Sequence, residues 1–110
     1  MSRRFSFKPK AAEDLDSIED YLAQNASLEV AKRFIDISDA PFERLAAMPE
    51  LGAIRTLANR ELLGLRMWPL GGGFEEYLVF YRPGRSGKGI ENVRVLHAKR
   101  DIEHLLKASD

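Results

Sequence analysis

The sequence predicts an α+β protein in which an N-terminal strand and a helical hairpin pack on a small antiparallel β-sheet, followed by a short C-terminal helix. Two apolar runs, LVFYR at 78–82 and NVRVLHA at 92–98, flank a loop rich in glycine and proline, which is typical of a β-hairpin. Apolar residues recur every three or four positions in two stretches before residue 48, which indicates two helices. Ile102, Leu105 and Leu106 share one face of a third helix.

Length and charge limit the function classes. A chain of 110 residues predicts a single domain spanning residues 1–110. Its 17 basic and 17 acidic residues balance, whereas nucleic-acid binding that does not depend on sequence usually needs a basic excess. We therefore expect no direct specific nucleic-acid binding, with a local basic patch as the remaining alternative. The absence of cysteine excludes disulfides, thiolate catalysis and cysteine-bound zinc. No apolar run approaches the ~20 residues of a membrane span and the N-terminus does not resemble a signal peptide, so we expect a cytoplasmic protein. We also expect no cofactor.

The first third of the chain predicts a strand and a helix. Residues 4–7 alternate as a strand does, and Pro9 suits the first turn of a helix, where its missing N–H is harmless. The apolar positions of this helix predict a buried stripe, while its acidic residues, Asp14 among them, predict a solvated face. The stripe consists of Ala11, Leu15, Ile18 and Leu22. Ser27 is a plausible N-cap for the next helix.

A second helix is predicted from about residue 28 to 47, with a break inside it. Pro41 lies within the apolar pattern, and an interior proline removes a backbone hydrogen bond. We therefore expect a kink or a restart near Ser38, with Pro41 on the solvent side. The predicted apolar face comprises Ala31, Phe34, Ser38, Phe42 and Leu45, widened by Ile35 and Ile37.

The second half predicts the sheet. Strands are expected at 65–70, 74–82 and 91–98, and the last two are too apolar to be sheet edges. Between the helices and these strands, Ile54 and Leu57 are expected to tuck under the sheet. The closing helix is expected to begin at Asp101.

Several segments, in this order, resemble one protein family. LGLR at 63–66, YLVFYR at 77–82 and VRVLHAKRDI at 93–102 look like the ParE branch of the RelE/ParE toxin superfamily, also described as plasmid stabilisation proteins. Residues 11–21 and 42–52 are similar to that branch as well. The chain departs from the usual pattern at Pro41, in the triple glycine and in the long loop at 83–89.

The resemblance implies the toxin of a two-gene, type II toxin–antitoxin module. ParE-like toxins poison DNA gyrase and are neutralised by a ParD-like antitoxin whose C-terminal segment folds onto them. The related RelE-like toxins are ribosome-dependent endoribonucleases that cleave messenger RNA, so the two branches share a fold and differ in action. A third alternative is a degenerate member that keeps only antitoxin binding.

Five residues form the predicted target-binding site, namely Arg66, Arg82, Arg94, His97 and Arg100. The four arginines lie at the ends of neighbouring predicted strands, and guanidinium groups bind phosphates and carboxylates with paired donors. The alternative is that each arginine pairs with a nearby carboxylate on a charge-balanced surface. His97 precedes the closing helix and matches a residue common in the ParE-like motif; its alternative is a capping or core role.

The ribonuclease hypothesis assigns catalysis to Tyr81, His97 and Arg94. Tyr81 or His97 would transfer the proton and the arginine would stabilise the charge of the phosphorane. Tyr81, together with Tyr77 and Trp68, could instead belong to the sheet core, and we expect two of these three to do so. His97, Asp101 and His104 match no recognised metal-ligand spacing, so no metal site is predicted. For the ParE-like function no catalytic residue is expected.

Overall fold

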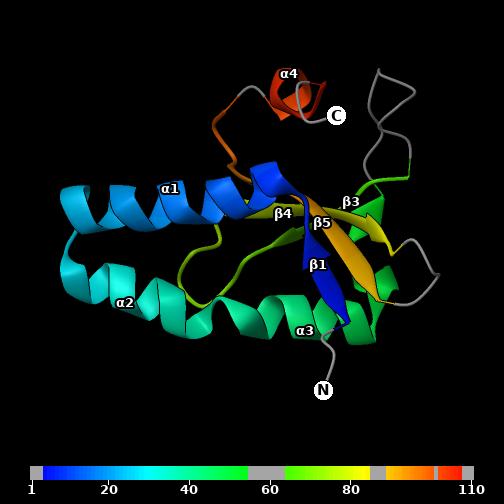
Figure 1. Ribbon diagram of the computed structural model, residues 1–110, viewed down its shortest axis with the longest axis horizontal. Helices are drawn as coiled ribbons and strands as arrows, with labels where there is room; N and C mark the ends of the chain where they lie inside the picture. Colours follow the sequence, from blue (N-terminus) through cyan, green and yellow to red (C-terminus); the bar gives the residue numbers. More distant parts are fainter. Residues whose placement is uncertain (1–3, 55–63, 85–88, 101, 108–110) are drawn as a thin grey trace.

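A computed structural model describes residues 4–54, 64–84, 89–100 and 102–107 of the chain. Its five-stranded sheet has the order β1-β5-β4-β3-β2; helices separate β1 from the other strands in the chain, and one helix follows β5 (Figure 1). The elements are β1 (Phe5–Phe7), α1 (Pro9–Asn25), α2 (Leu28–Ile37), α3 (Asp39–Ala47), the short 3-10 helix η1 (Pro49–Leu51), β2 (Ala53–Ile54), β3 (Arg66–Pro69), β4 (Tyr77–Pro83), β5 (Ile90–His97) and α4 (Ile102–Lys107).

Helices cover both faces of the sheet. One face carries Val79 and Tyr81 of β4 and packs against apolar residues of α1, α2 and α3. The other face carries Phe80 of β4 and packs against Ile102 and Leu106 of α4. Figure 1 shows α4 on the opposite side of the molecule from α2 and α3. The period-2 alternation of β4 therefore supplies two separate cores.

The predicted α+β class is confirmed, with one difference in the sheet. β4 and β5 are interior strands, as their apolar composition predicts, and the pairs β2–β3, β3–β4 and β4–β5 are antiparallel. β1, however, pairs with β5 in parallel, from Phe5 opposite Ile90 to Phe7 opposite Asn92. The sheet is mixed because the chain passes from β1 through three α-helices, η1 and three strands before it returns to β1's side.

The helical hairpin begins and breaks where the sequence predicts. Pro9 occupies the first turn of α1, and the Ser27 hydroxyl accepts the Val30 N–H at 3.0 Å as the cap of α2. The predicted second helix is two helices, α2 and α3, which meet at Ser38. The expectation of a solvent-facing Pro41 is wrong, because Pro41 is buried in the first turn of α3. In that turn a missing N–H disturbs no helical hydrogen bond, so the ring can face the core.

Two further apolar residues differ from expectation. Ile54 does not tuck under the sheet: it lies in the short edge strand β2 and is 64% exposed. Ile35 does not widen the buried face of α2 and is also exposed. Both follow from geometry, because a two-residue edge strand and the outer side of a helix are not covered by a second layer. Leu57, Asp101 and residues 85–88 of the predicted loop lie outside the described residues.

A bulge in β5 decides where its side chains point. Phe80 pairs with Arg94 and Tyr81 pairs with Asn92, so Val93 has no partner across the strand. The extra residue places Val93 in the core beneath α4, although a regular alternation with Val95 would place it on the opposite face. Arg94 lies on the same face as its cross-strand partner Phe80, beside α4.

Candidate functional site

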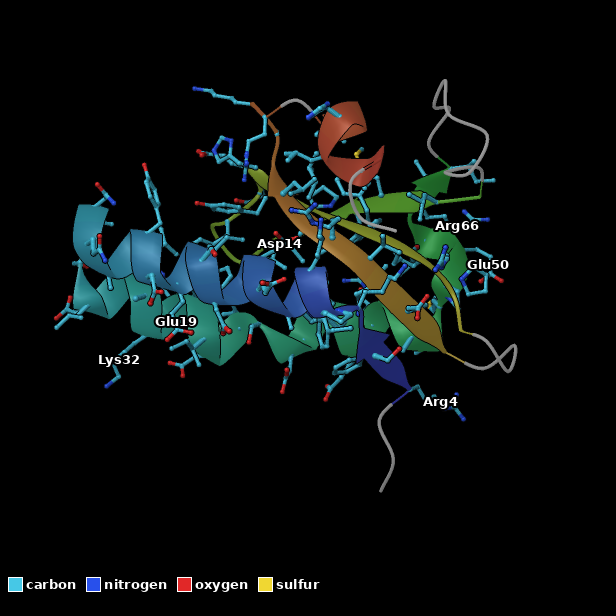
Figure 2. All side chains as sticks on the ribbon, turned by 45° about the horizontal axis from the view of Figure 1, so that its top comes forward. Arg4, Asp14, Glu19, Lys32, Glu50 and Arg66 are labelled. Carbon is cyan, nitrogen blue, oxygen red and sulfur yellow. The ribbon has the colours of Figure 1, made fainter. Side chains whose placement is uncertain are left out.

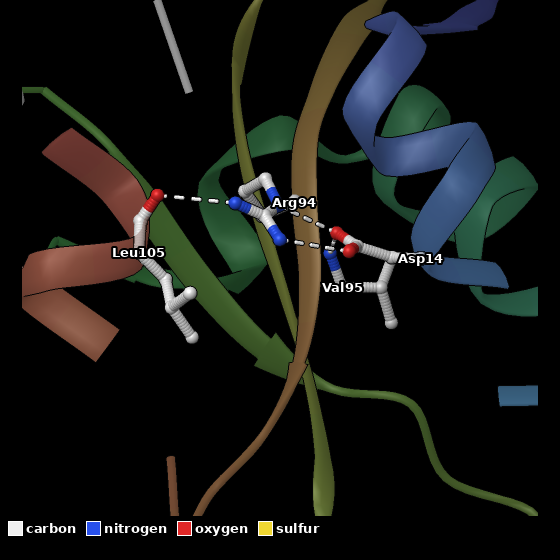
Figure 3. A network of polar contacts seen from close by, with 4 residues as sticks. All are labelled: Asp14, Arg94, Val95 and Leu105. Atoms are coloured by element: carbon white, nitrogen blue, oxygen red, sulfur yellow. Dashed lines mark hydrogen bonds and ion pairs between the residues drawn. The ribbon is translucent and has the colours of Figure 1, made fainter. Parts of the chain in front are cut away.

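Arg94 joins three elements through its guanidinium group. Its Nε donates to Asp14 Oδ2 at 2.7 Å and its Nη2 to Asp14 Oδ1 at 2.9 Å, while Nη1 donates to the Leu105 carbonyl at 3.0 Å (Figure 3). The N–H of Val95 also donates to Asp14, at 2.9 Å. Arg94 is only 7% exposed, so the fork links α1, β5 and α4 inside the protein.

Tyr81 also has a structural role. Its hydroxyl donates to the Pro49 carbonyl at 2.7 Å and accepts the Gly52 N–H at 2.8 Å, and the residue is fully buried. A Cβ on Gly52 would overlap the Tyr81 ring and hydroxyl, so glycine is required at this close approach. Burial raises the pKa of Tyr81, although the Gly52 hydrogen bond and the charge of Arg66 act to lower it.

Arg66 and Arg82, two more residues of the predicted target-binding site, each contact a different group within the protein. Arg66 on β3 donates to the Gly52 carbonyl at 2.6 Å and so fixes the turn before β2. Arg82 on β4 pairs with Glu91 of β5, with Nε 2.9 Å from Oε1. The structure therefore does not gather the four arginines into one basic cluster.

A groove of about 830 Å³ opens between α1 and the end of β5. Ile18, Leu22, Phe74 and Tyr77 are among the apolar residues that line it, and their buried contacts belong to the core on the α1 side. The exposed ring of Tyr21 also lines the groove. Figure 2 places Asp14 where α1 meets β5. The groove is thus an opening into the core whose floor is apolar.

The rim of the groove is mainly cationic. Arg33, Lys99 and Arg100 line it, and the guanidinium of Arg33 lies over the Phe74 ring at 5.8 Å from its centroid. Among the described residues no carboxylate pairs with these three cations. Of the two carboxylates that line the groove, Asp14 is neutralised by Arg94, and Glu76 contacts His97.

His97 is held at the rim by both ring nitrogens. Nδ1 accepts the Lys99 N–H at 3.1 Å, so the ring proton is on Nε2, which lies 3.1 Å from Glu76 Oε2. The ring also packs edge-on against Tyr77, with centroids 5.2 Å apart. Neither nitrogen is available for proton transfer without breaking one of these contacts.

Only two of the five predicted target-binding residues, His97 and Arg100, line the groove. As expected, two of the three aromatic candidates are core residues, namely Tyr77 and Tyr81. Sequence reasoning missed Arg33, Glu76 and Lys99 as rim residues. Two neighbouring basic residues, Lys99 and Arg100, follow His97 closely in the sequence, and this could have indicated a cationic rim. Arg33 had no such signal, because it reaches the groove only through the packing of α2.

Comparison with known families identifies the fold. The model of the ParE toxin family, described as the ParE toxin of the type II toxin–antitoxin system parDE, matches residues 5–102. The chain belongs to the ParE toxin family. A solved structure described as the chromosomal ParDE system from P. aeruginosa is similar, with a TM-score of 0.65 and 23% identity over 87% of this chain and 98% of that one. No curated protein matches the chain by sequence.

The described part of this ParE-family chain contains neither a membrane-spanning helix nor a cluster of metal ligands. None of its described helices is both long and apolar enough to cross a membrane. Within the same residues, no three histidine, aspartate or glutamate side chains gather as metal ligands, and Asp101 of the weighed His97–Asp101–His104 set lies outside them.

Proposed function

We propose that this ParE-family protein poisons DNA gyrase by binding it through the groove rim, and that a ParD-like antitoxin neutralises the protein by covering the same groove. His97 and Arg100 contact the target, together with Arg33 and Lys99. An apolar floor with a charged rim is the composition of a protein-binding surface, where a few arginine and aromatic anchors carry most of the energy.

The observation that carries this proposal is that the residues a ribonuclease would need are already hydrogen-bonded to other groups of the protein. The Tyr81 hydroxyl is buried and bound to two backbone groups, and Arg94 is held by Asp14 and the Leu105 carbonyl. Proton transfer to a messenger RNA requires a group that can reach the 2′-hydroxyl or the leaving oxygen. Binding, in contrast, requires only the exposed cations of the rim. The proposal therefore favours a binding toxin over a RelE-like ribonuclease.

The test measures supercoiling by purified gyrase with the purified toxin added. We expect the wild-type protein to inhibit supercoiling and the Arg100→Glu variant to lose most of this inhibition. Lys32→Glu is the matched control, because Lys32 is an exposed cation outside the groove and points away from Asp14 in Figure 2. This control should inhibit as the wild type does.

A translating extract supplies the opposing measurement. Cleavage of messenger RNA with normal gyrase activity would refute the gyrase proposal. Loss of inhibition in Lys32→Glu to the same degree as in Arg100→Glu would refute the groove as the contact site. Co-expression with the adjacent open reading frame tests the antitoxin, which should co-purify with the toxin.

A further inference from the structure

The second half of β5 is a sheet edge. β1 pairs with β5 only from Ile90 to Asn92, and the Lys8 N–H donates to the Asn92 carbonyl where the pairing ends. From Arg94 to His97, β5 pairs with β4 on one side. On the other side, within the described part of the chain, α1 and the groove take the place of a strand. Edge strands accept further strands because their backbone groups are unpaired.

The direction of each backbone group follows from two contacts. The Ala98 N–H donates to the Glu76 carbonyl at the β4 side, and the Val95 N–H donates to Asp14 on the other side. Because successive residues point to opposite sides of a strand, the Val95 carbonyl and the His97 N–H point away from β4. Neither of these two groups bonds to any residue of the described chain. Both residues line the groove.

These two groups define one pairing geometry. An antiparallel partner would need both the N–H and the C=O of one β5 residue, yet the Val95 N–H is taken by Asp14 and the His97 carbonyl accepts the Arg100 N–H. A parallel partner needs the carbonyl of one residue and the N–H of the second residue after it, which are the two groups that remain. Val95 is 1% exposed, so a donor placed in the groove would satisfy an otherwise buried carbonyl.

We infer that the groove binds an extended, acidic segment of the antitoxin as a short strand parallel to β5. One residue of the segment donates its N–H to the Val95 carbonyl, and its own carbonyl accepts the His97 N–H. The segment thus continues along the edge of β5 beyond Asn92, where the pairing with β1 ends. Carboxylates of the segment lie on Arg33, Lys99 and Arg100, and apolar side chains lie on the groove floor. Main-chain bonds of this kind give affinity, and the charged rim gives specificity.

This inference rests on the proposed function, and amide exchange separates the two. The probe is the protein encoded by the adjacent open reading frame, co-purified with the toxin. In the free toxin, the His97 amide should exchange with D₂O quickly; in the complex it should be protected at least tenfold. The Leu96 amide faces β4 and should be protected in both states, which makes it the internal control.

Variants at position 97 isolate the backbone donor. His97→Ala removes the imidazole and keeps the N–H, whereas His97→Pro removes both, and proline is tolerated where its nitrogen faces away from the sheet. We expect His97→Pro to bind the antitoxin about five- to tenfold more weakly than His97→Ala, the worth of about one hydrogen bond. The Lys99→Glu/Arg100→Glu pair should weaken binding further, and Lys32→Glu should not.

Each outcome has one meaning. A complex in which the His97 amide exchanges as in the free toxin, or in which the Pro and Ala variants bind equally, overturns the strand pairing and leaves the antitoxin proposal standing. Absence of any complex overturns the proposed function, and the inference falls with it. If His97→Pro does not fold, exchange at His97 in the wild-type complex decides alone.

Discussion

Arg94 and Arg100 lie six positions apart in one strand-to-helix stretch, yet the structure places them in opposite environments. Arg94 is buried, and its fork joins α1, β5 and α4. Arg100 is exposed at the groove rim and contacts no described carboxylate. The same side chain therefore serves the fold at one position and is available to a partner at the other.

This difference shows how a loss of toxicity must be interpreted. A toxin variant at Arg94 would lose activity because its fold is destabilised, and the same loss at Arg100 would report on binding. Measurements of unfolding free energy separate the two, and four substitutions should rank in a defined order.

Arg94→Ala should have the largest effect. It leaves the Asp14 carboxylate buried without its partner, which costs about 3–5 kcal/mol of unfolding free energy. Urea unfolding measures the loss. The double variant Asp14→Leu/Arg94→Met, which replaces the pair by apolar groups of similar size, should recover much of it. An unchanged unfolding midpoint in Arg94→Ala would show that the pair contributes nothing to the fold.

Tyr81→Phe should rank second. The substitution keeps the ring and leaves the Gly52 N–H and the Pro49 carbonyl without their partner, at a cost of about 1–3 kcal/mol. Equal stability of the variant and wild type would contradict the structural role. The substitution is therefore no clean probe of catalysis.

The pH dependence of the same tyrosine gives an independent measurement. Because the folded-state pKa of Tyr81 is raised, the folded protein holds this proton more tightly than the unfolded chain does. The resulting stability is complete below the usual tyrosine pKa of about 10 and is lost as pH rises through the folded-state pKa. Wild type should lose stability above pH ~10 more steeply than Tyr81→Phe. Parallel curves of stability against pH for the two proteins would contradict this prediction. Tyr77, whose pKa burial also raises, is present in both proteins and therefore contributes equally to both curves.

Pro41→Ala should destabilise by about 1 kcal/mol, since the ring is buried and its loss also frees the unfolded chain. A solvent-facing proline would give no loss. Thermal unfolding at neutral pH distinguishes the two, with Ala40→Gly at the exposed neighbouring position of the same turn as a measure of local helix sensitivity.

Arg100→Ala should have the smallest effect on stability, within about 0.5 kcal/mol of wild type, because an exposed side chain that pairs with no described residue contributes little. Its loss should appear instead in gyrase inhibition. A destabilisation as large as that of Arg94→Ala would remove the contrast between the two arginines.

Much of the fold follows from local patterns in the sequence. Apolar composition placed β4 and β5 inside the sheet, Ser27 marked the start of α2, and Pro41 marked the break between α2 and α3. Each of these signals acts within a few residues. The parallel pairing of β1 with β5 joins opposite ends of the chain, so no local pattern could predict it.

The candidate site was less predictable, for the same reason. Asp14 belongs to an acidic series that predicts a solvated helix face, but its side chain is 12% exposed because Arg94, 80 positions away, binds it. The register shift brings Val93 onto the α4 side of the sheet beside Arg94, and nothing in the sequence marks that extra residue. Arginine-rich strand ends were visible in the sequence; which of them would be buried was not.

The pairing of β1 with β5 also determines when this edge of the sheet can form during synthesis of the chain. The Asn92 amide donates to the Ser6 carbonyl across 86 positions, so this edge of the sheet cannot close until nearly the whole chain has left the ribosome. Long-range contacts of this kind slow folding, because the ends must meet before the contacts stabilise them. Residues 95–100, which complete the groove, emerge even later. During synthesis the nascent chain therefore has no groove, and its apolar floor residues stay available to chaperones until the last moments of translation.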